Sequence, residues 1–346
     1  MKTSVVIVGG GPAGLAAAVS CYDAGVKDIL ILERDNCLGG ILNQCIHNGF
    51  GLHRFGEELS GPEYAHRQAT ELAGKVEFLY DTTALSVDGD ARVLHAINEG
   101  GSLAIQAKAI VLATGSRERG LGALNIAGDR PSGVFTAGSA QAFVNLYGCL
   151  PGKKAVMQGS GDIGLIMARR MALSGMEVMC VYNRSKKPSG LERNIVQCLN
   201  DFNIPLITGK NITRLEGKDR LEAVWVADVD PETKQVIPGT DVRVECDTLV
   251  LSIGLVPENE LAASAGCTVD SRTNGCVVDD TLATNVPGVF ACGNAVHIHG
   301  LADDASREAD AAGVNVARYL GADVDAVHVD LDAAAPAAVG AAAEAA

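Results

Sequence analysis

Two glycine-rich segments of the G-x-G-x-x-G type stand far apart in this chain, each between a strand-like and a helix-like pattern. The first is Gly9–Gly14, after the apolar run 4–8, and the second is Gly159–Gly164, after the apolar run 155–157. A glycine turn that opens a helix lets backbone N–H groups approach a pyrophosphate at the positive end of that helix. One such motif is weak evidence, but two in this context predict a protein that holds two dinucleotides.

The length of 346 residues suits two domains of ordinary size. The formal net charge of −14 argues against nucleic-acid binding, which needs a basic surface. No apolar run has the length of a transmembrane helix and no signal-peptide pattern precedes the first strand, so we expect a cytoplasmic protein. The ten cysteines form no CxxC pair and no histidine–carboxylate spacing suggests a metal, so no metal site is predicted.

The residues that follow the first glycine loop read as a Rossmann-like unit. A helix is expected over 13–24 and a strand over 29–33, and both follow the strand at 4–8. Further along, the pattern predicts a helix over 62–73, an antiparallel meander with strands at 84–88, 92–97 and 103–107, and a strand that runs from 109 into Ala113-Thr114-Gly115.

The same order of elements recurs after the second glycine loop. The expected elements are a helix over 163–174, a strand over 177–182, a helix over 190–201, a hairpin within 221–246 and a strand over 247–254, and the chain then ends with a helix over 302–319. We therefore predict an α/β protein with two Rossmann-like dinucleotide-binding domains of the three-layer β/β/α type, the second inserted in the first. The predicted segments are a first dinucleotide-binding domain at 1–120 and 251–325, a second at 121–250, and a disordered Ala-rich tail at 326–346.

The residue after the second strand differs between the two units. Glu33 stands where an acid accepts hydrogen bonds from ribose hydroxyls. The corresponding place in the second unit holds Asn183-Arg184, with Lys186 and Lys187 beyond, and no carboxylate. Because a basic cluster attracts a 2′-phosphate, this pattern favours NADPH over NADH. The alternatives are a solvated basic loop or a site that no longer binds nucleotide well.

Together, the first loop with Glu33, the motif 113–115, the second loop and the segment 288–294 resemble the two-dinucleotide-binding flavoproteins of the pyridine nucleotide–disulfide oxidoreductase superfamily, in the thioredoxin-reductase-like form. The resemblance implies that the first loop binds FAD and the second NAD(P)H. It also places Gly293-Asn294 at the ribityl–phosphate part of FAD, with Asn294 in place of the usual Asp. The predicted FAD residues are Gly9, Gly11, Pro12, Ala13, Gly14, Glu33, Arg34, Gly40, Ala113, Thr114, Gly115, Gly293 and Asn294, and those for NAD(P)H are Gly159, Gly161, Asp162, Ile163, Gly164, Asn183 and Arg184.

Three stretches, 37–51, 130–138 and 189–194, are similar to flavoprotein subunits found beside glycerol-3-phosphate-dehydrogenase-like proteins and, more distantly, to flavin subunits of amino-acid and opine dehydrogenases. In such systems the flavoprotein exchanges electrons with a partner subunit. The resemblance therefore implies a partner dehydrogenase or an iron–sulfur electron-transfer protein. The oligomeric state stays open, with a homodimer as one option.

The chain departs from the disulfide reductases at their thiols. Thr136 and Ser139 stand where thioredoxin reductases carry CxxC, and Cys45 lacks the thiol partner that glutathione-reductase types carry five residues earlier, so no dithiol relay is expected. The resemblance places Cys45 and His47 near the flavin ring, as candidates for a redox thiol and an acid–base group. Packing roles are the alternatives, and Cys37 could pair with Cys45.

In the same superfamily, the N-terminus of the helix expected over 302–319 points at the flavin, and its partial positive charge stabilises the reduced ring. His297 and His299 could add to this effect or could cap a turn. The predicted function is an FAD-dependent oxidoreductase that passes electrons between NAD(P)H and a partner redox protein or dehydrogenase subunit. The alternatives are a self-sufficient thioredoxin-reductase-like or small-acceptor reductase that uses Cys45, and a non-catalytic FAD-holding subunit of a dehydrogenase complex.

Overall fold

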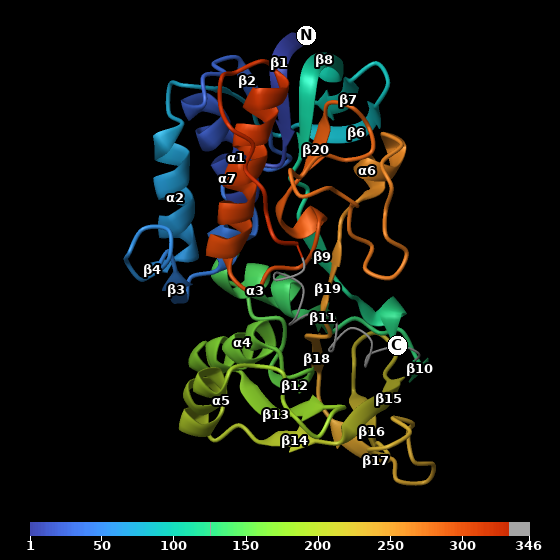
Figure 1. Ribbon diagram of the computed structural model, residues 1–346. Coiled ribbons are helices and arrows are strands. Elements are labelled where there is room, and N and C mark those ends of the chain that lie inside the picture. Colours follow the sequence, from blue (N-terminus) through green and yellow to red (C-terminus); the bar gives the residue numbers. More distant parts are fainter. Residues whose placement is uncertain (125, 332–346) are drawn as a thin grey trace. The chain divides into compact units, whose positions relative to one another are not determined.

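The computed structural model describes residues 1–124 and 126–331, which form two compact units (Figure 1). The first unit consists of Met1–Arg117 and of the described residues from Val256 onward, and the second is Glu118–Leu255. The first unit is thus discontinuous in sequence and the second is continuous. This arrangement agrees with the predicted insertion of one dinucleotide-binding fold in another.

The first unit contains most of the long elements. Its strands are β1 (Lys2–Val8), β2 (Ile29–Leu32), β3 (Asn48–Phe50), β4 (Leu59–Ser60), β5 (Glu77–Leu79), β6 (Thr83–Asp88), β7 (Val93–Asn98), β8 (Gly101–Leu112) and β20 (Val289–Ala291). Its helices are α1 (Pro12–Asp23), α2 (Gly61–Glu71), α6 (Glu260–Ser264) and α7 (Ala302–Tyr319), with the 3₁₀ turns η1 (Gly40–Gln44) and η4 (Gly293–Ala295). The strand order is β5-β2-β1-β8-β7-β6, and β20 also pairs with β8.

Strand β8 belongs to two parts of this sheet. Its first half pairs antiparallel with β7, and its second half runs parallel to β1 and β20. The prediction of separate strands at 103–107 and from 109 is therefore wrong. The alternation of buried Ile105, Ala107 and Ala109 continues without a break, so a single strand serves both the meander and the parallel sheet.

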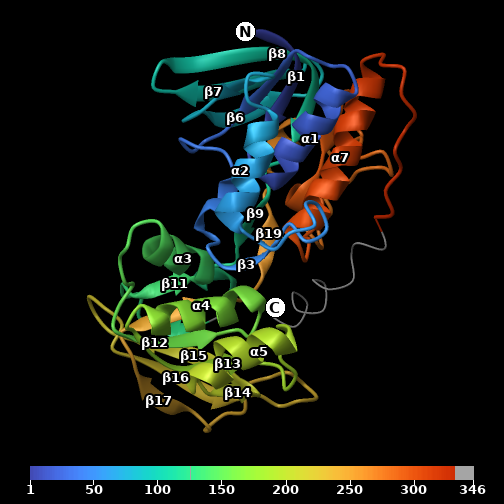
Figure 2. The same cartoon turned by 90° about the vertical axis from the view of Figure 1, so that its left-hand side faces the viewer.

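The two faces of the parallel strands bury different cores. Val5 and Ile7 of β1 pack with residues of α1 and α7, whereas Val6 and Val8 pack with residues of the meander. Helices α1 and α7 lie side by side in both views (Figures 1 and 2). Their close approach needs Gly313, because a Cβ there would lie 2.2 Å from the carbonyl oxygen of Ala17. The helix that follows the first glycine loop is therefore held along its length.

The second unit repeats this architecture. Its strands are β10 (Ala127–Gly128), β11 (Val134–Thr136), β12 (Lys154–Gln158), β13 (Glu177–Asn183), β14 (Leu206–Thr208), β15 (Lys210–Glu216), β16 (Ala223–Asp228), β17 (Val242–Glu245) and β18 (Thr248–Leu251). Its helices are α3 (Ala137–Asn145), α4 (Asp162–Leu173) and α5 (Glu192–Cys198), with η2 (Leu121–Ala123) and η3 (Asn200–Phe202), and the connecting strands β9 (Ser116–Glu118) and β19 (Leu255–Pro257) pair with each other. A parallel sheet β11-β18-β12-β13-β14 and a second sheet β10-β15-β16-β17 make up its layers.

Three elements of the second unit differ from the prediction. The helix expected over 190–201 is shorter and is split into α5 and η3, and the hairpin of β16 and β17 is extended by β15. Helix α3 was not predicted at all. Its short, weakly amphipathic sequence offers little periodic signal, and Thr136 marks its start only through a side-chain cap.

The end of the chain is described only to residue 331. There the N–H of Val327 donates to Asn315 Oδ1 at 2.9 Å and the N–H of Val329 donates to the carbonyl oxygen of Asp280 at 2.8 Å. The predicted disorder from 326 onward is therefore wrong for these first residues, and the rest of the predicted tail lies outside the described residues.

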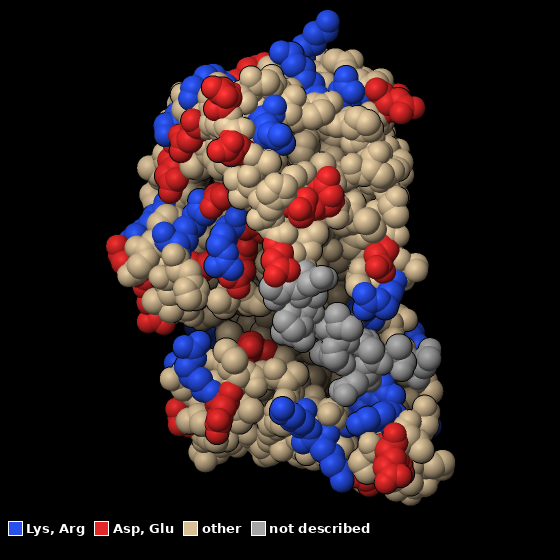
Figure 3. Space-filling view, viewed as in Figure 1, with Lys and Arg blue, Asp and Glu red and all other residues tan. Residues whose placement is uncertain are grey.

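Among the described helices, none combines the length and the apolar character needed to cross a membrane. On the described part of the face drawn in Figure 3, acidic and basic side chains are interspersed.

Candidate functional site

The first glycine loop joins β1 to α1 through a turn that is tight on its inner side. Gly9 has φ +107°, and a Cβ there would lie 2.4 Å from the carbonyl oxygen of Ala113. A Cβ on Gly14 would lie 1.9 Å from the carbonyl oxygen of Gly9. At Gly11, by contrast, no described atom lies within 4 Å of the place that a Cβ would take. The loop therefore leaves open space beside the first N–H groups of α1, which have no partners within their helix.

Glu33 supports this loop from the end of β2. Glu33 is buried, with 5% of its surface exposed. Its carboxylate accepts hydrogen bonds from the N–H of Gly10 at 2.8 Å and from the N–H of Asp35 at 2.9 Å. A carboxylate has about four lone-pair sites, so these two bonds leave capacity for hydroxyl donors. The neighbouring Arg34 is exposed. Glu33 thus shapes the loop, which is a role that was not predicted. It also retains the capacity to accept hydrogen bonds from ribose hydroxyls, which was predicted.

Predicted residues from three other segments gather around the same loop. A Cβ on Gly40 would lie 3.3 Å from Gly11 Cα, and a Cβ on Gly293 would lie 2.6 Å from Ala13 Cβ. The turn Ala113-Thr114-Gly115 is fixed by Thr114, whose hydroxyl donates to the carbonyl oxygen of Glu258 at 2.6 Å. The structure therefore brings together residues that are widely separated in the sequence.

Asn294 is part of a buried polar network that sequence reasoning missed. Its Oδ1 accepts the N–H of His299 at 2.9 Å, and its Nδ2 donates to Ser116 Oγ at 3.2 Å. Glu308, on α7, places Oε2 3.2 Å from His299 Nε2 and 3.5 Å from His297 Nδ1, and its Oε1 accepts the N–H of Gly293 at 2.8 Å. Burial and the adjacent His299 lower the pKa of His297. No histidine–carboxylate set was predicted because the carboxylate comes from the following helix.

The first turn of α7 carries Asp303 and Asp304. Asp303 is buried and accepts the N–H groups of Gly51, His53 and Arg54 at 3.0, 3.2 and 2.9 Å. Carboxylates in a first turn offset the partial positive charge of a helix N-terminus. The positive charge that the resemblance implied at this helix end is therefore reduced by the chain itself.

Cys45 and His47 follow η1. Cys45 Sγ donates to the carbonyl oxygen of Ile41 at 3.3 Å, and burial raises the pKa of the thiol to about 12. A Cβ on Gly61 would lie 2.9 Å from Cys45 Cβ, so Cys45 packs against the start of α2. The His47 ring lies 5.2 Å from that of Phe50, and burial lowers the pKa of His47. These surroundings favour packing over the redox role for Cys45.

Thr136 and Ser139, which stand where thioredoxin reductases carry CxxC, lie at the start of α3. Thr136 caps α3, with its Oγ1 2.9 Å from Ser139 Oγ. Cys37, which was considered as a partner of Cys45, is exposed.

The second glycine loop has the same construction as the first. Gly159 has φ +102°, and a Cβ there would lie 2.0 Å from the carbonyl oxygen of Ser252. A Cβ on Gly164 would lie 2.8 Å from Ser252 Cβ, whereas at Gly161 the nearest atom would be Ser252 Oγ at 3.7 Å. Ser252 therefore takes the place that Ala113 holds in the first unit.

The surroundings of this loop differ from those of the first. Asp162 Oδ1 accepts the N–H of Leu191 at 2.8 Å and Nδ2 of Asn194 at 2.7 Å, and Ile163 is exposed. Asn183 Nδ2 donates to the carbonyl oxygens of Ser185 at 2.7 Å and Lys187 at 3.2 Å. The amide thus folds the chain that follows β13 into a turn.

That turn carries the basic residues predicted for the second site. Lys186 and Lys187 are exposed, and Arg184 is half-buried and donates from Nη2 to the carbonyl oxygen of Lys234 at 2.8 Å. Asn183 itself is buried, with 8% exposed. Asn183, which replaces the usual acid, therefore holds a turn that carries three basic residues. We call Arg184–Lys187 the cationic turn.

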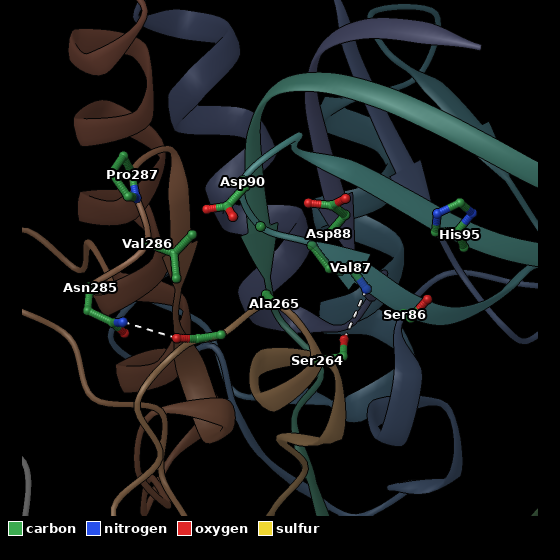
Figure 4. A pocket seen from close by; sticks show the side chains of 12 residues that line it. Ser86, Val87, Asp88, Asp90, His95, Ser264, Ala265, Asn285, Val286 and Pro287 are labelled. Carbon is green, nitrogen blue, oxygen red and sulfur yellow. Dashed lines mark hydrogen bonds between the residues drawn. The ribbon is translucent and has the colours of Figure 1, made fainter.

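A wide pocket of about 730 Å³ lies elsewhere in the first unit (Figure 4). Two of its polar residues are engaged in local structure: Ser264 Oγ accepts the N–H of Val87 at 3.0 Å, and Asn285 Nδ2 donates to the carbonyl oxygen of Gly266 at 3.0 Å. The described lining contains none of the predicted cofactor residues. We therefore centre the candidate site on the glycine loops.

Known proteins resemble this chain over most of its length. It is 29% identical over 278 residues to the alpha subunit of sarcosine oxidase from Corynebacterium sp. (strain U-96), covering 74% of this chain and 27% of that protein. It is 24% identical over 319 residues to an opine oxidase subunit of Agrobacterium tumefaciens (strain Ach5), covering 86% of this chain and 62% of that protein. The chain therefore spans less than two thirds of these relatives.

The fold comparison gives the same picture. The crystal structure of T. acidophilum thioredoxin reductase superposes with a TM-score of 0.72 and 22% identity, covering 92% of this chain and 97% of that one. This likeness confirms the predicted fold class. Residues 3–309 match the family described as Pyridine nucleotide-disulphide oxidoreductase, which in general implies FAD and NAD(P)H as cofactors. The chain belongs to the pyridine nucleotide-disulphide oxidoreductase family.

Proposed function

We propose that this protein is an FAD-dependent oxidoreductase that passes electrons between NADPH and a partner redox protein or dehydrogenase subunit. The observation that carries the proposal is the pair of glycine loops with one construction, each closed by a backbone carbonyl oxygen, of Ala113 in one unit and of Ser252 in the other. Each loop leaves space beside its middle glycine, at the start of a helix. Two such loops suit two different dinucleotides.

The first loop and its neighbours fit FAD. The space at Gly11 admits a pyrophosphate, and the first turn of α1, which is fully described, contains no acidic side chain that would repel it. Glu33 keeps acceptor capacity for ribose hydroxyls, and Gly40, Thr114 and Asn294 surround the same region. When bound, FAD supplies a ring that accepts a hydride from a nicotinamide and returns electrons to an acceptor.

The second loop is proposed to hold the nicotinamide dinucleotide. Asn183 fixes the turn that presents Arg184, Lys186 and Lys187, so the cations stand where a ribose-binding acid usually does. This charge favours a 2′-phosphate and hence NADPH. Asp162 would otherwise repel phosphate at the start of α4, but its carboxylate is turned to Leu191 and Asn194.

The partner is inferred from the residues that stand at the two positions where the superfamily carries redox thiols. A thiol relay needs a reactive cysteine, whereas Cys45 has a pKa raised to about 12 and Thr136 and Ser139 replace the other thiol pair. Two of the relatives are subunits by name, and another, 26% identical, is a ferredoxin–NADP reductase of Ignicoccus hospitalis. Electrons are therefore proposed to leave the chain for a separate protein.

An anaerobic visible-absorbance titration tests this function. The purified protein should show a flavin band that NADPH bleaches at lower concentration than NADH does. Replacing Cys45 by Ser should leave the bleaching and the subsequent transfer to an added ferredoxin unchanged. A colourless protein that does not take up FAD would contradict the proposal. A band that neither nucleotide bleaches would instead favour the FAD-holding subunit.

A further inference from the structure

Two histidines and one carboxylate converge behind the first glycine loop. His297 and His299 lie in the segment after η4, and Glu308 lies on the buried face of α7. One ring nitrogen of each histidine and Glu308 Oε2 all lie within 4.8 Å of one another. We propose that these three residues bind a divalent transition-metal ion, with one coordination position left open.

The hydrogen bonds of His299 orient it as a metal ligand. Asn294 Oδ1 is identified as the oxygen because it accepts the backbone N–H of His299 at 2.9 Å, and it also lies 3.2 Å from His299 Nδ1. Nδ1 must therefore carry the proton to make an attractive contact. In neutral imidazole this places a lone pair on Nε2, which points at Glu308 Oε2. Two lone pairs face each other unless a cation or a proton lies between them.

The distances favour a metal ion over a proton. Glu308 Oε2 is 3.2 Å from His299 Nε2 and 3.5 Å from His297 Nδ1, whereas hydrogen bonds between ionised partners are about 2.7–2.9 Å long. In a tetrahedral site with metal–ligand bonds of about 2.0–2.1 Å, neighbouring ligand atoms are about 3.3 Å apart. One ion would satisfy all three atoms, whereas one proton satisfies a single pair.

The surroundings resemble the supporting shell of a metal site. Ligand histidines usually donate their second N–H to a carbonyl or carboxylate, as His299 does to Asn294, and ligand carboxylates are themselves hydrogen-bonded, as Glu308 is to the N–H of Gly293. The side chains of His299 and Glu308 are only 5% and 7% exposed. Within the described chain, His297 Nε2 is buried without a partner. Two of the three ligands, His299 and Glu308, are therefore held by hydrogen bonds before any ion arrives.

The ligand types restrict the ion. Two imidazoles and one carboxylate suit Zn²⁺ and other late first-row divalent ions, and they are a poor set for Ca²⁺ or Mg²⁺, which prefer oxygen. Three protein ligands leave a tetrahedral ion with one position for water or a small ligand. We therefore choose Zn²⁺ as the probe.

The test is a Zn²⁺ titration of the FAD-loaded protein after dialysis against a chelator, followed by calorimetry and by metal analysis of the washed protein. The wild-type protein should bind one equivalent. His297→Ala, His299→Ala and Glu308→Gln should each weaken binding at least tenfold, whereas His66→Ala, at an exposed position on α2, should not. X-ray absorption should show nitrogen and oxygen ligands at about 2.0–2.1 Å.

Retained flavin absorbance and the far-UV spectrum show whether each variant is folded, and His297→Gln supplies a milder change if an alanine variant is not. Binding of Zn²⁺ by the wild-type protein that is no stronger than that of the His299→Ala variant would overturn the proposal. That result would mean that a proton alone holds the three side chains together. Because the readout is metal binding, it is independent of whether NADPH reduces the flavin.

Discussion

The two glycine loops share a strand–turn–helix construction, but they differ in how tightly the turn closes and in what surrounds it. In the first, a Cβ on Gly14 would lie 1.9 Å from the carbonyl oxygen of Gly9, and in the second the equivalent Cβ on Gly164 would lie 3.1 Å from that of Gly159. Glu33 accepts two backbone N–H groups beside the first loop, whereas Asn183 donates to two carbonyl oxygens beside the second. The side chain at this position therefore accepts hydrogen bonds in the first unit and donates them in the second.

This difference separates two parts of dinucleotide recognition. The pyrophosphate is met by backbone groups and helix ends, which depend on glycines and are duplicated in the two units. The ribose is met by side chains, which can change from acidic to basic without altering the backbone. We therefore expect the two loops to bind a pyrophosphate in the same way and to differ in how they recognise the ribose.

The largest expected effect comes from Gly14→Ala. Its methyl group would overlap a backbone oxygen that cannot move without opening the loop, so we expect a loss of about 3–5 kcal/mol in unfolding free energy and release of the flavin. The matched Gly164→Ala change should lose about 1–2 kcal/mol, because its neighbours are farther away. Flavin release in urea follows the first unit, and fluorescence of Trp225, the single tryptophan, follows the second. Equal losses would contradict the stated asymmetry of the loops.

Thiols of the two units should react very differently. At pH 8 a thiol with a pKa near 12 is almost wholly protonated, so Cys45 should be alkylated about a thousandfold more slowly than a thiol of ordinary pKa. The exposed Cys149 of the second unit is the internal comparison. Because burial raises the pKa of an acid group, the rate at Cys45 should climb tenfold with each pH unit from 8 to 10. Peptide mass spectrometry after timed iodoacetamide treatment measures the alkylation rates of Cys45 and Cys149. Rapid labelling of Cys45 at pH 8 would support the redox role instead of packing.

Glu33→Gln should weaken FAD binding about 10–100-fold. One of the two N–H groups that the carboxylate accepts would then face an amide NH₂, which forfeits a charged hydrogen bond of about 1.5–3 kcal/mol. Glu77→Gln removes the same charge at an exposed position on β5 and should leave affinity unchanged. Quenching of flavin fluorescence during reconstitution measures the FAD affinity of both variants. Similar affinities would show that Glu33 does not contribute to FAD binding.

The smallest effect is expected in the cationic turn. Replacing Lys186 and Lys187 together by Ala should raise the NADPH concentration needed for half-bleaching about tenfold and leave that for NADH within about twofold, since NADH has no 2′-phosphate. Lys153→Ala, an exposed change in the same unit, is the control for general charge. Parallel loss for both nucleotides would show that the turn does not read the 2′-phosphate.

Much of the fold was predictable because its signals are local. Helices α1, α4 and α7 and the strands beside the glycine loops come within a residue or two of their predicted bounds, since hydrophobic periodicity and glycine turns are written in short segments. The predictions failed for β8, where one continuous strand replaces two, and for α3, where a side-chain cap marks the start of the helix. The second half of β8 depends on pairing with β1, which is distant in sequence, whereas the start of α3 depends on the side-chain cap of Thr136.

By itself the sequence determined two strand–loop–helix units, the missing thiol pairs, and an acid in one unit opposed by a basic turn in the other. Only the tertiary structure decided which distant groups meet. It placed Ser252 against Gly159, and Glu308 within 3.5 Å of both His297 and His299. It also placed Asp303 against the N–H groups of Gly51, His53 and Arg54. The physical reason is that a turn is set by the dihedral angles of a few adjacent residues, whereas a cluster of side chains exists only after packing has fixed the helix that carries one of its members.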